Sequence, residues 1–100
     1  MNEPVKLDSY YETRCGLVAK VRAIDTSKKS NVIATVLFPP HSVDPESPGK
    51  EHSYDKGMKA NRTFGLHGEA TSTGAENPYD FMREVEKPAD WDDLPDPAFT

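Results

Sequence analysis

Residues 10–38 have the sequence YYETRCGLVAKVRAIDTSKKSNVIATVLF, which holds two strand patterns separated by a turn. Between residues 17 and 24 apolar and basic side chains alternate, which is typical of a strand with one buried face. The apolar positions are Leu17, Ala19, Val21 and Ala23. Residues 32–38 are apolar on both faces and rich in β-branched side chains, as expected for a central strand. The polar residues 25–31 favour a turn, so we predict an antiparallel hairpin.

Shorter strand patterns flank this hairpin at residues 10–14, 51–54, 58–66 and 78–86. The last pattern is ambiguous, because Asn77 followed by Pro78 also begins helices well. Its alternation of apolar and polar side chains favours a strand. Residues 39–49 contain four prolines and predict a loop, and residues 65–74 predict a flexible connection. The expected fold is mainly β, a small antiparallel sheet or partly open barrel of four to five strands.

Charge divides the chain unevenly. Residues 84–100 hold six acidic residues and one lysine, which accounts for the whole net charge of −5. We therefore predict a lead-in over residues 1–9, a small β domain over residues 10–86 and an extended, acidic, proline-rich C-terminal tail over residues 87–100. A neutral body argues against direct, non-specific nucleic-acid binding. An acidic tail contacts a basic surface or keeps the protein in solution.

Cysteine content and leader patterns suggest the compartment. Cys15 is the single cysteine, so no internal disulfide can form, which fits a reducing cytoplasm. The first residues have no signal-length apolar core, and no run approaches a membrane span. We expect a cytoplasmic protein without a membrane partner.

No pattern for a cofactor or for catalysis is found. With Cys15, the three histidines match no metal-ligand spacing: His41, His52 and His67. Phosphate-loop, dinucleotide and hydrolase motifs do not occur. A lone cysteine between Arg14 and Gly16 is more often structural than nucleophilic. We predict no cofactor, no metal and no enzymatic activity.

The tail carries the most specific short feature, DWDDLPDPAF. Closely spaced carboxylates with apolar anchors suit docking into a pocket rimmed by Lys and Arg. The candidate partner-binding residues are Asp90, Trp91, Asp92, Asp93, Leu94 and Phe99. Two other interpretations remain open: the carboxylates imitate nucleic-acid phosphates, or the tail only solubilises the chain.

A second candidate site is the basic face of the hairpin, since residues 10–38 carry a net charge of +3. Aromatic and cationic side chains together can bind a nucleotide by stacking and charge. The candidate residues are Tyr10, Tyr11, Arg14, Lys20 and Arg22. A solvated sheet face is the simpler interpretation. The same basic hairpin could also hold the acidic tail of its own chain.

Two resemblances add to these patterns. The tail resembles the acidic, Pro-Phe-ending tips of bacterial single-stranded-DNA-binding proteins, although Thr100 follows Phe99 here. Residues 11–16 and 19–21, YETRCG and AKV, resemble the start of a family of small phage and prophage β-proteins. Residues 32–34 and 79–81, VIA and YDF, follow in the order of that family's later parts, and the long insertion at 39–49 departs from it.

This resemblance implies a phage-encoded, mostly β protein in the host cytoplasm. Small phage proteins of this kind often bind host enzymes or defence systems. The expected function is an accessory protein that inhibits or redirects a host protein with a basic surface, such as a nuclease or defence component. The alternative is a nucleotide-sequestering or small-ligand-sequestering protein, acting as a homo-oligomer. A structural component of the virion is a third interpretation.

Overall fold

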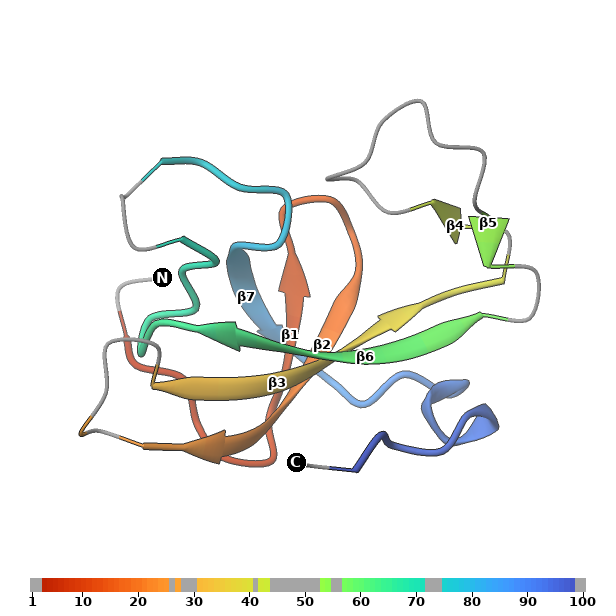
Figure 1. Cartoon of the computed structure of the whole chain (residues 1–100), viewed down its shortest axis with the longest axis horizontal. Coiled ribbons are helices and arrows are strands. Elements are labelled where there is room, and N and C mark those ends of the chain that lie inside the picture. Colours follow the sequence, from red (N-terminus) through yellow and green to blue (C-terminus); the bar gives the residue numbers. More distant parts are fainter. Residues whose placement is uncertain are drawn as a thin grey trace.

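The computed structural model describes residues 3–25, 27, 31–40, 42–43, 53–54, 57–71 and 75–98. Within these residues the chain forms seven strands and one 3-10 turn (Figure 1). The five longer strands are β1 (Tyr10–Thr13), β2 (Val18–Ile24), β3 (Val32–Phe38), β6 (Met58–Phe64) and β7 (Phe81–Val85). The short strands β4 (Ser42–Val43) and β5 (Ser53–Tyr54) pair as a separate ribbon, and the 3-10 turn η1 covers Trp91–Asp93.

The longer strands form one open antiparallel sheet in the order β6-β3-β2-β1-β7. Strands β1, β2, β3 and β6 follow one another as a meander. The last strand, β7, returns to pair with the first. The mainly β prediction is confirmed, and so are the hairpin and the strand interpretation after Asn77.

Strand register sorts the side chains onto two faces, because residues directly opposite in neighbouring strands point to the same side. Tyr11, Ala19, Val36 and Ala60 lie opposite one another in β1, β2, β3 and β6. This row points into the core. The neighbouring row points the other way, and its members are Tyr10, Lys20, Thr35 and Asn61.

The core lies on the first of these faces and is rich in aromatic rings. Tyr11 stacks on Phe81 with ring centroids 5.2 Å apart, and Phe81 contacts Phe64 at 4.5 Å. Tyr79 is fully buried beside Phe38. Val5 also packs into this cluster, so the segment before β1 contributes to the core. Large rings allow a small sheet to bury much apolar area.

Arg62 places a charged side chain among the apolar residues on the core side of β6. The sequence predicts one apolar parity in this strand, interrupted by Arg62. The structure places the guanidinium over the ring of Tyr79, with Cζ 3.9 Å from the ring centroid. A cation can lie on an aromatic face at little cost, so the charge is accommodated on the core side of the sheet.

The connection after β6 crosses to the free edge of β7. Gly68 accepts a hydrogen bond from the backbone N–H of Phe81 at 3.0 Å, and Leu66 accepts one from Val5 at 2.7 Å. Gly65 donates to the carbonyl of Glu69, which starts a turn and ends β6 at Phe64 rather than at residue 66 as predicted. Composition predicts a flexible loop over residues 65–74. The contacts above hold the first part of this loop against β7 and the segment before β1. Residues 72–74 lie outside the described residues.

Two further boundaries differ from the sequence analysis. A loop is predicted over residues 39–49, but Ser42–Val43 forms β4. A strand is predicted from residue 51, and β5 covers Ser53–Tyr54, with residues 51–52 outside the described part of the chain. No helix in the described residues is long and apolar enough to cross a membrane.

Replacing Gly68 with Ala should destabilise the fold strongly. Its φ is +79°, and a Cβ there would lie 2.5 Å from the Cβ of Phe81. Left-handed strain and displacement of the core together should lower the free energy of unfolding by about 3 kcal/mol or more. Urea unfolding followed by circular dichroism measures this loss.

Gly16→Ala is the matched control. Gly16 also has a positive φ, +88°, but nothing lies within 4 Å of a Cβ built there. Only the backbone strain of about 1–2 kcal/mol should remain. Equal losses for the two variants would show that the contact between Gly68 and Phe81 does not restrain the fold.

Candidate functional site

The C-terminal tail folds back over the face of the sheet opposite the core (Figure 1). We call residues 91–98 the docked segment. The outer face is the surface that it covers, formed by Tyr10, Lys20, Arg22, Thr35, Lys59 and Asn61. The sequence suggested that the basic hairpin could hold the tail in cis, and the structure confirms this. The tail therefore forms a second layer on the sheet.

Trp91 anchors the docked segment. It is 1% exposed, and its ring meets Tyr10 edge-on at a centroid distance of 5.1 Å. The ammonium of Lys59 lies over the same ring, 4.3 Å from the centroid. Backbone hydrogen bonds from Trp91 to Pro88 and from Asp93 to Asp90 close the turn around the anchor. Aromatic packing and a cation–π contact thus hold η1 against the sheet.

Lys59 makes the central polar contacts of the outer face. Its side chain is only 2% exposed, and Nζ donates to the carbonyl of Leu94 at 2.7 Å and to Asp96 Oδ1 at 2.8 Å. Lys20 Nζ lies 4.0 Å from the other carboxylate oxygen of Asp96. The hydrogen bond from Lys59, with the nearby positive charges, lowers the pKa of Asp96 below its ordinary value of 3.8.

Three further side chains of the outer face continue the polar contacts along the docked segment. Arg22 donates to the carbonyl of Pro97 and to Thr35 Oγ1. The Thr35 hydroxyl donates to Asn61 Oδ1 at 2.6 Å, and Asn61 Nδ2 donates to the carbonyl of Ala98 at 3.3 Å. Each of these groups meets an acceptor of the docked segment or positions a neighbour that does. The outer face therefore holds the docked segment through three of its carbonyls and one carboxylate.

The six partner-binding candidates in the tail divide into different environments. Trp91 is buried and Leu94 is half-buried, whereas Asp90, Asp92 and Asp93 are exposed. Asp92 pairs with Lys87 at 2.8 Å and raises the pKa of that lysine. Phe99 lies outside the described residues. The carboxylate that contacts the sheet is Asp96, which the sequence analysis did not select.

The five candidates for nucleotide binding do not converge on one surface. Tyr10, Lys20 and Arg22 lie under the docked segment. Tyr11 points to the opposite face, where it is buried in the core and its hydroxyl accepts a hydrogen bond from the backbone of Lys6. Arg14 lies beyond β1, beside Asp80. Neighbouring strand residues point to opposite faces, so Tyr10 and Tyr11 cannot share a site.

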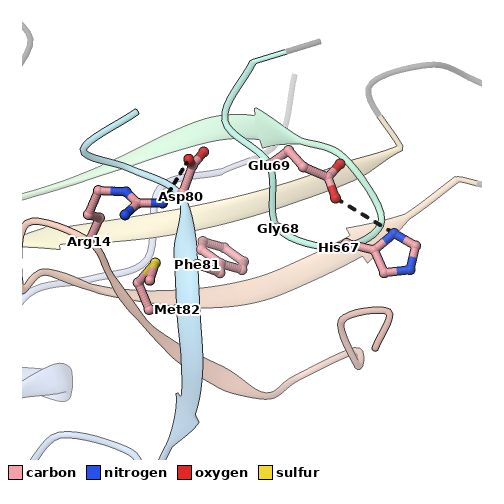
Figure 2. Close-up of a pocket in the computed structure, with 7 residues that line it drawn as sticks. All are labelled: Arg14, His67, Gly68, Glu69, Asp80, Phe81 and Met82. Atoms are coloured by element: carbon pink, nitrogen blue, oxygen red, sulfur yellow. Dashed lines mark ion pairs between the residues drawn. The ribbon is translucent and has the colours of Figure 1, made fainter. Parts of the chain in front are cut away.

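A cleft of about 240 Å³ lies beside Arg14, where the connection after β6 meets the start of β7 (Figure 2). Arg14 and Met82 lie on one side of Phe81, and His67 and Glu69 on the other (Figure 2). Arg14 pairs with Asp80 at 3.7 Å, and His67 with Glu69 at 3.6 Å.

The carboxylate of Asp80 is engaged in loop structure. It accepts hydrogen bonds from the backbone of Ala70 at 2.8 Å and from that of Asn77 at 3.0 Å. Asn77 Oδ1 accepts one from the backbone of Tyr79. These bonds fix the turn that leads into β7, so the carboxylate of Asp80 has a structural role.

A second hollow, of about 290 Å³, is also lined by Arg14 and includes Cys15. Cys15 is exposed, and its Sγ lies 3.2 Å from the hydroxyl of Thr13. His41 and His52 lie outside the described residues. Among the residues that the structure describes, no three His, Cys, Asp or Glu side chains gather as metal ligands do.

Lys59, Asn61 and Thr35 were missed by the sequence analysis, although a signal existed. In β6, Lys59 and Asn61 follow the parity opposite to Met58 and Ala60, which identifies them as outward-facing, and Thr35 of β3 lies opposite Asn61. Comparison of the chain with family models, with curated proteins and with solved structures finds no match.

Trp91→Ala should lower the free energy of unfolding by about 3 kcal/mol or more, because a large buried ring is lost. Trp91→Phe should have a smaller effect, since a phenyl ring keeps much of the contact with Tyr10. Met82→Ala is the control, because Met82 is 48% exposed and should change stability by under about 0.5 kcal/mol. Urea titration measures all three. A loss below about 1 kcal/mol for Trp91→Ala would show that the turn is not anchored by its ring.

Acid should release the contact of Asp96. Its pKa is lowered in the folded protein, so its contribution is complete above the ordinary value of 3.8 and is lost as pH falls through the lower folded value. Stability should therefore fall on acidification below about pH 4, and Asp96→Asn should flatten this part of the profile. Asp93→Asn, at an exposed position of the same docked segment that makes no contact with Lys59, should leave the profile unchanged. Identical profiles for wild type and Asp96→Asn would contradict the assignment.

Proposed function

We propose that the protein is a non-enzymatic, phage-encoded accessory protein that binds a host protein with a basic surface. The acidic turn around η1 is the docking element. The supporting observation is the burial of Trp91, which holds the turn on the sheet and leaves Asp90, Asp92 and Asp93 exposed.

A fixed turn is a better ligand than a free tail. Ordering a mobile segment on binding costs conformational entropy, whereas an anchored turn has already been ordered during folding. The exposed carboxylates of Asp90, Asp92 and Asp93 lie within four residues of one turn, so their fields add there. Complementary charge accelerates encounter and disfavours acidic partners. Such a turn suits the nucleic-acid-binding surface of a nuclease or defence protein in the host cytoplasm.

The alternative of nucleotide sequestration is not adopted. Its five candidate residues lie in three different environments, and the three on the outer face are already engaged by the docked segment. A nucleotide would have to displace that segment before it could contact them.

The decisive test neutralises the exposed carboxylates without disturbing the anchor. Removing the whole tail would also uncover the outer face, so loss of binding by a truncated chain would be ambiguous. In the variant Asp90→Asn, Asp92→Asn, Asp93→Asn the buried Trp91 and the contacts of Asp96 are unchanged. A tagged wild-type chain should retain a host protein from bacterial lysate in low salt, and the variant should retain at least about tenfold less.

A variant with the same charge change elsewhere is the control. It carries Glu3→Gln, Asp8→Asn and Glu76→Gln, three exposed positions outside the tail. Asp8 has a φ of 62°, a conformation that asparagine adopts readily. This variant should capture the same protein as wild type. Equal loss in both variants would indicate a net-charge effect, and equal capture by all three chains would refute docking through the turn.

A further inference from the structure

We propose that the outer face is itself a peptide-binding site, occupied in cis by the docked segment, and that it binds an acidic, aromatic segment of a partner protein. The proposal goes beyond the proposed function. It uses the groups that point toward the sheet, whereas the proposed function uses carboxylates that point to solvent.

The first support is the direction of the hydrogen bonds. The donors belong to the sheet: Lys59, Arg22 and Asn61. The acceptors belong to the segment and are three backbone carbonyls and one carboxylate. Backbone carbonyls are common to all peptides, so most of these contacts do not depend on the sequence of the occupant. Specificity resides in the aromatic ring and the carboxylate.

The second support is the buried ammonium of Lys59. A side chain that is 2% exposed and charged needs full compensation, and its partners among the described residues are the ring of Trp91, Leu94 O and Asp96 Oδ1. These partners define what another occupant must supply. It must place an aromatic ring at one position, a carbonyl three residues later and a carboxylate five residues later.

The third support is an unsatisfied hydrogen-bond donor in the docked segment. Trp91 is 1% exposed, and its Nε1 finds no hydrogen-bond acceptor among the described residues. A buried donor without a partner weakens the contact that contains it. A segment with a phenyl ring at this position avoids that loss. The tail's advantage is its covalent linkage, which raises its effective concentration at the face.

The only tryptophan of the chain provides the reporter. In the full-length variant Trp91→Ala, Asp96→Asn the segment loses its anchor and its carboxylate, and the protein has no tryptophan. A synthetic peptide of residues 88–98, PADWDDLPDPA, then carries the sole tryptophan of the mixture. Titration should give saturable binding with a shift of the indole emission to shorter wavelength. The occupied reference is the full-length variant Trp91→Phe, which should bind the peptide at least about tenfold more weakly because its own tail competes.

Two lysine variants locate the binding. We call the variant Trp91→Ala, Asp96→Asn the vacated chain. Lys59→Gln, added to the vacated chain, should weaken peptide binding at least about tenfold, because charge-assisted hydrogen bonds are stronger than neutral ones. Lys6→Gln is the matched control, since Lys6 is exposed and pairs with Glu84 away from the segment. Circular dichroism checks that each chain keeps its sheet. Should the vacated chain unfold, Trp91→Phe, Asp96→Asn replaces it and should bind the peptide more tightly than Trp91→Phe alone.

The outcomes of these titrations distinguish an acidic peptide from nucleic acid and from a second copy of the chain as the occupant of the outer face. No binding to a folded, vacated chain, or binding indifferent to Lys59→Gln, would overturn the proposal and leave the segment as a brace for the sheet. Displacement of the peptide by oligothymidylate at lower concentration than by unlabelled peptide would assign the face to nucleic acid instead. Concentration-dependent dimers of the wild type in sedimentation, lost in Trp91→Ala, would make a second copy the occupant. In none of these cases is the test of the acidic turn affected.

Discussion

Burial of the Lys59 ammonium couples the sheet to the tail. A charge taken out of water must be compensated by its surroundings, and in the described part of the chain the compensating groups belong to Trp91, Leu94 and Asp96. Lys59 lies on β6, an outer strand of the sheet, so its side chain could return to solvent if the segment left. Docking of the tail and desolvation of Lys59 are therefore one event.

The tail covers part of the second face of a small sheet. Antiparallel sheets often pack one face on a core and leave the other in water. Here the aromatic cluster fills one face, with rings contributed by β1, β6 and β7. Eight residues with one large ring and a row of carbonyls cover much of the other. Such a layer buries little apolar area, which is why it depends on polar contacts and on one anchor.

The sequence predicts most of the sheet because alternation is a local property. The hairpin, the strand after Asn77 and the attraction between basic hairpin and acidic tail follow from residue type and charge. The outer face could not be predicted in the same way. Its row from Tyr10 to Asn61 depends on the register of four strands, and Arg62 interrupts the apolar parity that would have oriented β6. Which carboxylate faces inward also depends on that register, and hence Asp96 was not singled out.

Trp91 links the two proposed surfaces. It holds Asp96 and the carbonyls against the sheet and, through the same turn, keeps Asp90 and Asp93 exposed to solvent. A peptide that displaced the segment would free the carboxylates from their fixed arrangement. A partner bound to the fixed arrangement would in turn favour the docked state. Coupling between binding equilibria is reciprocal, so each partner would weaken the other by the same factor. The anchor that holds the tail on the sheet is then also the group through which the two surfaces would communicate.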